Sequence, residues 1–68
     1  MEPLKFIQGL LGTKICVSLR DGTDYVGMLR TFDEHINLML SDVEEASVDD
    51  ILFLRGDNIL SISETKLG

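Results

Sequence analysis

The stretch "KICVSLRDGTDYVGMLRTF", Lys14 to Phe32, decides the fold. In "KICVSLR" apolar and polar residues alternate, which is typical of a half-buried β-strand. "DGT" then predicts a turn with Gly22 at positive φ. "DYVGMLRTF" predicts a second strand, in which Gly27 indicates a sharp bend or a bulge. A tight hairpin with a bent second strand predicts a strongly curved antiparallel sheet.

The rest of the 68-residue chain predicts one helix and three more strands. In "EPLKFIQGLLG" a proline at the first helical position and apolar residues at helical spacing predict a short amphipathic helix over about residues 3–11. "HINLMLSDV", "DILFLR" and "NILSIS" predict strands three to five, the last two joined by Gly56-Asp57. We therefore expect a single all-β domain, residues 1–68, built as a small, strongly bent, five-stranded antiparallel barrel with its N-terminal helix over the open end.

A chain of this length has a thin core, and such domains usually need a staple or a partner. Cys16 is the single cysteine and cannot form an internal disulfide, and no residues stand at metal-ligand spacing. The stretch "ILFLRGDNILSIS" is apolar on both faces, which is hazardous for a hairpin at a sheet edge unless another chain covers it. We expect strand pairing between subunits; if the contact is head-to-tail, it makes a closed ring when the rotation between neighbours closes.

The charge balance is acidic, with six Lys and Arg against twelve Asp and Glu. This argues against a protein that coats nucleic acid, but a local site that reads bases remains compatible with it. Much of the acid lies in "SDVEEASVDD", Ser41 to Asp50, which we interpret as a solvated hairpin end. The lone thiol and the lack of a secretory leader suggest an intracellular protein. No apolar run is long enough to span a membrane, and no arrangement of residues suggests an enzyme, a cofactor or a metal site.

The chain resembles the Sm and Sm-like (LSm) family over nearly its whole length. The first family motif is similar to "VSLRDGTDYVGMLRTFDEHINLMLSDVEE", residues 17–45, and the second occupies residues 51–62, opening with "ILFLRGDNI". Within the family, "EPLKFIQ", "DEHINLMLSDVEE" and "FLRGDNI" are most similar to the third eukaryotic Sm-like paralogue, while the opening "PLKFIQGLLGTKI" also suits the fifth. The connection "EEASVDD" is shorter than either paralogue usually carries.

The resemblance implies an SH3-like barrel, the Sm fold, assembled into six- or seven-membered rings in which strand four of one subunit pairs with strand five of the next. It implies uridine-rich single-stranded RNA as the ligand, bound at the central pore. Such rings act on the 3′ end of U6 RNA in pre-mRNA splicing or on messenger RNA ends in decay, which would place the protein in the nucleus, the cytoplasm or both. Two alternatives stay open: a scaffold subunit with little RNA contact of its own, and a homo-oligomeric ring of the isolated chain.

On this resemblance the RNA site is predicted to comprise His35, Asn37, Arg55, Asp33, Gly56 and Asp57. A uracil needs a flat surface and hydrogen-bonding groups on its pairing edge. The His35 ring and the Arg55 guanidinium could stack on its two faces, and Asn37 offers both a donor and an acceptor. Asp33 would fix the Asn37 amide, and Gly56 would admit close approach with Asp57 beside it. The plainer alternatives are a solvated His35, an Asn37 that only braces a turn, and an Arg55 paired with Asp57.

Overall fold

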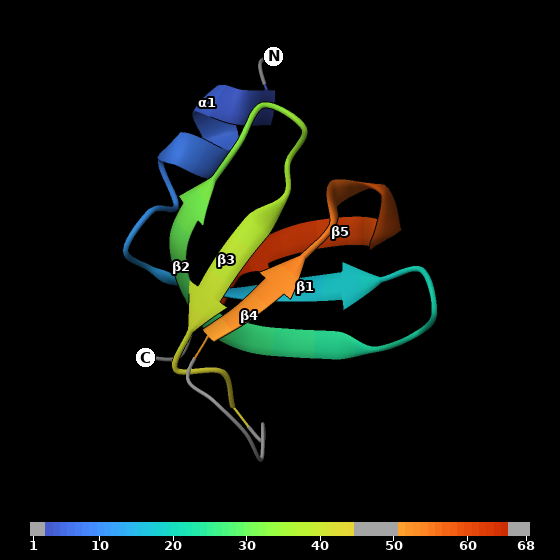
Figure 1. The fold of residues 1–68 in the computed structure, drawn as a ribbon. Helices are drawn as coiled ribbons and strands as arrows, with labels where there is room; N and C mark the ends of the chain where they lie inside the picture. The colour runs from blue at the N-terminus through green and yellow to red at the C-terminus, as the bar shows by residue number, and fades with distance from the viewer. Residues whose placement is uncertain (1–2, 45–50, 66–68) are drawn as a thin grey trace.

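The computed structural model describes residues 3–44 and 51–65, and its core is one antiparallel sheet of five strands bent sharply back on itself (Figure 1). The chain runs through α1 (Pro3–Gln8), β1 (Lys14–Leu19), β2 (Asp24–Phe32), β3 (Leu38–Ser41), β4 (Ile51–Leu54), a 3-10 turn (Gly56–Asn58) and β5 (Ile59–Glu64). The strand order is β4-β3-β2-β1-β5, so β4 and β5 are the two edges of the sheet. The predicted fold class, a helix followed by a five-stranded bent antiparallel barrel, is confirmed.

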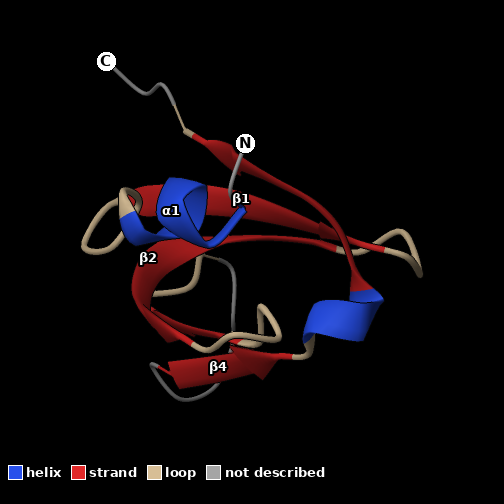
Figure 2. Cartoon of the chain, turned by 90° about the horizontal axis from the view of Figure 1, so that it is seen from above, coloured by secondary structure: helices blue, strands red, loops and turns tan. Residues whose placement is uncertain are grey.

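The helix α1 lies over one end of the curved sheet, as Figure 2 shows from above. It ends at Gln8, three residues before the predicted end at residue 11, because the chain there tightens into bonds three residues apart. The Leu10 N–H donates to the Ile7 carbonyl at 2.9 Å and the Leu11 N–H to the Gln8 carbonyl at 3.2 Å. Of the apolar residues expected on its face, Ile7 and Leu10 are buried, whereas Leu4 and Leu11 remain exposed.

The core lies on the concave side of the sheet. Its members come from the helix segment and four strands, namely Ile7, Leu10, Ile15, Val17, Leu29, Leu38, Leu40 and Leu54. The alternation predicted for the first strand is realised, because Ile15 and Val17 are fully buried while their neighbours are only partly covered. Within residues 3–44 and 51–65 the core has eight side chains, which is small, as expected for so short a chain.

The sharp bend of β2 has two separate causes. Gly27 allows the end of β3 to approach, because a Cβ at this position would lie 3.0 Å from the Ser41 carbonyl oxygen and 3.2 Å from Val43 Cγ2. The bulge itself lies further along, where the register with β3 shifts between Leu29 and Thr31. The prediction of a bend or bulge at Gly27 was therefore partly wrong, because that glycine stays in register with β1. Gly22 has the expected positive φ, 92°.

Strand β3 is shorter than the predicted span from His35 to Val43. It begins only at Leu38, because residues 33–37 form a closed turn in which the Ile36 N–H donates to the Asp33 carbonyl at 3.0 Å. The predicted placement of Ile36 and Leu38 on one face of a strand is wrong for Ile36, which has φ of 63°. The acidic segment predicted as a hairpin end lies largely at residues 45–50, outside the described residues.

Candidate nucleic-acid interface

Two turns far apart in the sequence meet near the helix end of the sheet. Residues 33–37 connect β2 to β3, and residues 55–58 connect β4 to β5. They meet because β3 pairs with β4 in a register that sets Leu38 opposite Leu54, so the residues preceding one strand lie beside those following the other. Between the turns lies an open hollow of about 630 Å³ lined by His35, Asn37, Arg55 and Asp57. Four of the six predicted site residues therefore share one hollow.

Asp33 stands behind this hollow and organises the first turn. Its Oδ1 accepts the backbone N–H groups of His35 at 2.9 Å and Asn37 at 3.0 Å, and its Oδ2 accepts the Asn37 Nδ2 at 2.9 Å. The hydrogen bonds from the Asn37 side chain and backbone lower the pKa of the Asp33 carboxyl below its ordinary value. Asp33 is therefore a charged brace at neutral pH and orients the Asn37 amide.

The orientation of the Asn37 amide is fixed from both ends. Its Oδ1 accepts the backbone N–H of Gly56 at 2.7 Å, while its Nδ2 donates to Asp33. Exchanging oxygen and nitrogen would break both bonds, so only one orientation is consistent with this network. An amide has two donor hydrogens and two acceptor lone pairs. One donor and one acceptor site of Asn37 thus remain for a ligand, and Asn37 braces the turn without losing its capacity to read a base.

Gly56 is the point at which the two turns touch. A Cβ built there would lie 2.1 Å from the carbonyl oxygen of His35 and 3.0 Å from the carbonyl atoms of Ile36. No other residue type fits without moving one turn away from the other. The close approach predicted for Gly56 is thus realised between two backbone segments, and this contact sets the spacing between Arg55 and His35.

The ionisable groups of the hollow are exposed and paired with close neighbours. An Nη atom of Arg55 lies 3.2 Å from the Asp57 carboxylate, and the His35 Nε2 lies 3.6 Å from the Glu34 carboxylate. The Arg55 and His35 side chains are 78% and 76% exposed, so their flat faces are open to solvent. The Arg55–Asp57 pairing that sequence reasoning kept as an alternative does occur. An ion pair made at the edge of a guanidinium leaves its faces available for stacking.

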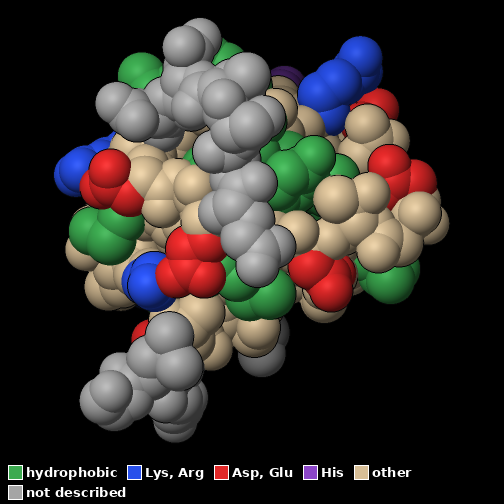
Figure 3. Space-filling view, turned by 90° about the horizontal axis from the view of Figure 1, so that it is seen from below, with side chains coloured by type: hydrophobic (Ala, Val, Ile, Leu, Met, Phe, Trp, Pro, Cys, Tyr) green, Lys and Arg blue, Asp and Glu red, His purple; other side chains and the backbone are tan. Residues whose placement is uncertain are grey.

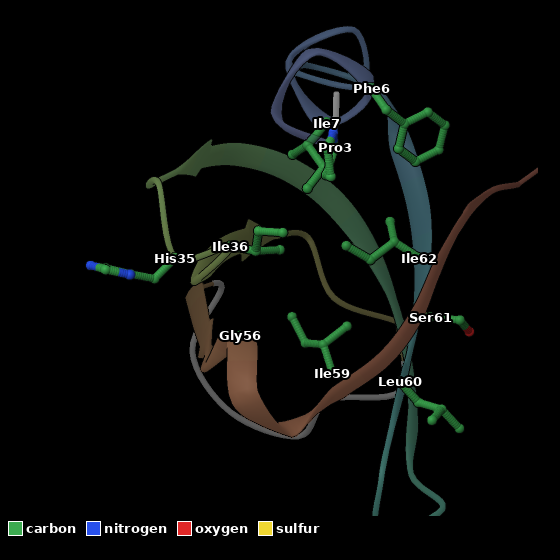
Figure 4. A pocket seen from close by; sticks show the side chains of 10 residues that line it. All are labelled: Pro3, Phe6, Ile7, His35, Ile36, Gly56, Ile59, Leu60, Ser61 and Ile62. Atoms are coloured by element: carbon green, nitrogen blue, oxygen red, sulfur yellow. The ribbon is translucent and has the colours of Figure 1, made fainter. Parts of the chain in front are cut away.

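Sequence reasoning missed the part played by Ile36. A β-branched residue rarely adopts positive φ, and Ile36 does so at 63°. Figure 4 shows its side chain directed into a groove with Ile7, Ile59 and Ile62, while the His35 ring points away from that groove. Packing of Ile36 against the core compensates for the backbone strain and turns its neighbour toward the hollow. No signal in the sequence distinguishes this from an ordinary strand residue.

Arg20 was also missed. Its Nε donates to the carbonyl oxygen of Asp57 at 3.1 Å, across 37 positions of the chain. Its backbone N–H donates to the Asn58 carbonyl at 2.8 Å. Arg20 thus holds the turn that carries Arg55, as Asn37 does through its bond to Gly56. The contact depends on the pairing of β1 with β5, which the local sequence around Arg20 does not reveal.

The described residues give little support for a metal site or a membrane-spanning segment. There, no group of three or more His, Cys, Asp or Glu side chains is placed to hold a metal ion. None of the helices in this part is long and apolar enough to cross a membrane. On the face seen in Figure 3, the acidic side chains stand apart from one another, some beside hydrophobic and some beside basic side chains. The hollow between the two turns is therefore the best candidate for a functional site.

Comparison with known proteins places the chain within one family. The LSM domain family matches residues 5–64. A probable U6 snRNA-associated Sm-like protein of Encephalitozoon cuniculi (strain GB-M1) is 44% identical over 63 residues, which cover 91% of this chain and 90% of the relative. The U6 snRNA-associated Sm-like protein LSm6 of Lodderomyces elongisporus is 36% identical, covering 94% of this chain and 88% of the relative. The Sm-like protein LSM3B of Arabidopsis thaliana is 35% identical, covering 91% and 83%.

Solved archaeal structures share the fold. The Sm protein of Pyrococcus abyssii, in complex with a uridine heptamer, superposes with a TM-score of 0.83 at 32% identity, covering 96% of this chain and all of that chain. A heptameric archaeal Sm protein superposes with a TM-score of 0.78 at 35% identity, covering 90% and 97%. These matches confirm the predicted Sm fold. The family consists of RNA-binding proteins without enzymatic activity, which confirms that prediction too. Relatives named LSm6 and LSM3B are similarly distant, so the third or fifth paralogue stays a prediction.

Proposed function

We propose, because the chain belongs to the LSM domain family, that it is an RNA-binding subunit of an Sm-like ring and binds uridine-rich single-stranded RNA ends. The observation that carries the proposal is the hollow in which His35, Asn37 and Arg55 meet. The complex of the archaeal relative with a uridine heptamer supports uridine as the ligand. The predicted roles of Asp33, Gly56 and Asp57 are proposed as supports of this hollow rather than as its base-contacting surface.

In the proposed mechanism a uracil enters the hollow edge-on toward Asn37. The remaining Asn37 donor hydrogen bonds a uracil carbonyl, and the remaining Oδ1 lone pair accepts the uracil N3–H. The His35 ring and the Arg55 guanidinium stack on opposite faces of the base. Stacking is worth about 1–3 kcal/mol per base, so a single subunit binds weakly. When several subunits form a ring, an RNA bound at one subunit reaches the next without a new bimolecular encounter, and this raises its overall affinity.

The ring itself is supported by the two open edges of the sheet. On the strands β4 and β5 the large side chains Ile51, Phe53 and Leu60 are 52%, 73% and 65% exposed. Their burial against another subunit would be favourable by about 25 cal/mol per Å² of apolar surface. We propose that β4 of one subunit pairs with β5 of the next in a six- or seven-membered ring. The heptameric archaeal relative supports seven.

The relatives named for U6 RNA favour a role in pre-mRNA splicing with U6 RNA, and hence a nuclear location. We propose this role first, with messenger RNA decay in the cytoplasm as the second. Among paralogues, we propose a position like that of the third or sixth Sm-like subunit, since relatives bearing both names match over most of the chain. We retain one domain over residues 1–68 as a proposal.

A scaffold subunit with little RNA contact of its own is the second candidate function, favoured by the net charge of −6. Titration of fluorescently labelled oligouridine into the assembled ring separates the two. Under the RNA-binding proposal, Arg55→Ala weakens binding by about tenfold or more while native mass spectrometry finds the ring intact. Lys5→Ala removes an exposed cation on α1 that does not line the hollow, and it serves as the control. Equal affinity of wild type and Arg55→Ala leaves the scaffold function.

A further inference from the structure

Arg20 occupies a special position on the turn between β1 and β2. Its Nε–H bond to the Asp57 carbonyl and its backbone bond to the Asn58 carbonyl dock it onto the turn that closes the uracil hollow. The Asp57 carboxylate meanwhile pairs with Arg55. Two guanidinium groups thus hold Asp57 in place, one by its backbone and the other by its side chain.

Arg20 differs from the other arginines in its ionic contacts. Among the described residues, Lys14 pairs with a carboxylate, and so do Arg30 and Arg55. Arg20 has no carboxylate partner in this part of the chain, and the bond to Asp57 uses only its Nε. The two Nη groups therefore form an open fork on a guanidinium that is already held in place. Such a fork fits the oxygens of a phosphate group.

A second hollow, of about 330 Å³, lies beside this fork and is lined by Leu19, Arg20, Asp21 and Asn58. The consecutive residues Asp57 and Asn58 line the first and the second hollow respectively, so the two hollows adjoin across one turn. Asp21 brings a like charge to a phosphate there. Its Oδ1 accepts the Thr23 N–H at 2.9 Å, which engages this carboxylate within its own turn.

We propose that Arg20 binds a phosphodiester group of the single-stranded RNA whose base occupies the uracil hollow. This proposal rests on the proposed function, since it takes that hollow as the base site. The ribose-phosphate chain leaves the base over the turn 55–58 and meets the Arg20 fork in the second hollow. A phosphate contact fixes the register of the RNA and carries no sequence information. Arg20 therefore adds affinity, and the base specificity stays with Asn37.

The test compares Arg20→Gln with Lys5→Gln, because Lys5 is an exposed cation on α1 that lines neither hollow. Labelled oligouridine and oligocytidine of equal length are titrated into each assembled ring at several salt concentrations. Arg20→Gln lowers the affinity for both ligands by the same factor and reduces the slope of log K against log salt by about 0.7 for each phosphate that is no longer neutralised. Arg20→Lys restores much of the slope because the charge remains. Lys5→Gln leaves both quantities near wild type.

Three results overturn the inference. The first is a wild-type slope for Arg20→Gln, the second a slope change no larger than that of Lys5→Gln, and the third a weakening confined to oligouridine, which would make Arg20 a support of the base site alone. Failure of the proposed function is seen separately, in a wild-type ring that ignores oligouridine altogether. Native mass spectrometry of each variant confirms that rings of equal size are compared.

Discussion

Replacing Gly56 by alanine tests whether the contact between the two turns builds the site. The added Cβ would lie 2.1 Å from the His35 carbonyl oxygen, whereas real Cβ atoms essentially never approach within 3.0 Å. The turns must therefore separate by about 0.9 Å, and the obstructing atoms are backbone, which cannot rotate away. Overpacking of this kind costs about 1–3 kcal/mol. The Asn37 bond to the Gly56 N–H, now 2.7 Å, is lengthened by the same displacement.

We expect Gly56→Ala to lower the Tm by about 4 °C or more, since a domain of this size loses about 4–8 °C per kcal/mol. Its affinity for oligouridine falls by about tenfold or more, because the Arg55 and His35 faces no longer clasp one base. Thermal unfolding and fluorescence polarisation at one fixed protein concentration measure both. Gly9→Ala is the matched control, with its added Cβ at ordinary contacts of 3.5 Å and 3.7 Å. Wild-type stability and affinity in Gly56→Ala would refute the reasoning.

Three further outcomes follow from the hydrogen bonds and exposed side chains. Asn37→Ala leaves the partly buried Gly56 N–H without its partner and lowers the free energy of unfolding by about 1–3 kcal/mol in urea titrations, whereas Asn58→Ala changes it little. The pKa of Asp33 is lowered, so its stabilising effect is complete at neutral pH and is lost as the pH falls below its ordinary value of 3.8. When the free energy of unfolding is measured against pH, Asp33→Asn should therefore show a smaller loss of stability in acid. Phe53→Asp on the exposed edge should dissociate the ring in native mass spectrometry while each subunit stays folded. Leu11→Asp, at an exposed position after α1, should leave the ring intact.

Strands in which apolar and polar residues alternate were predictable from the sequence, whereas the conformations of the turns were less predictable. The second strand was predicted with the bounds that the structure has, Asp24–Phe32, although its burial alternates only as far as Leu29, where the bulge shifts the pattern. The third was predicted too long, because His35, Ile36 and Asn37 continue the alternation of "HINLML" into residues that the structure places in a turn. The deciding interactions there are the bonds of Asp33 to backbone, which compete with strand pairing. A local pattern cannot weigh that competition.

The six candidate site residues were found through chemistry and resemblance, while their supports were hidden. Asn37 and Arg55 are suited to bases by their functional groups, which the sequence displays. The packing of Ile36 at positive φ and the bond from Arg20 to the turn of Asp57 depend on elements meeting in space. Arg20 reaches that turn only because β5 returns beside β1 in antiparallel register. Contacts between residues so far apart in the chain produce no periodic pattern in the sequence.

The charges decide what kind of RNA binding this chain can support. Lys14, Arg30 and Arg55 each face a carboxylate, and the chain as a whole carries −6, so a broad unpaired basic surface cannot supply the affinity. On the proposals made above, stacking and base-edge contacts supply most of the affinity, and the phosphate contact proposed for Arg20 adds one interaction in each subunit. Because each contact is weak, an RNA gains from every neighbouring subunit it reaches. Such a ring selects its ligand by base identity and by length together, and an RNA too short to bridge subunits binds far more weakly even when every base is uracil.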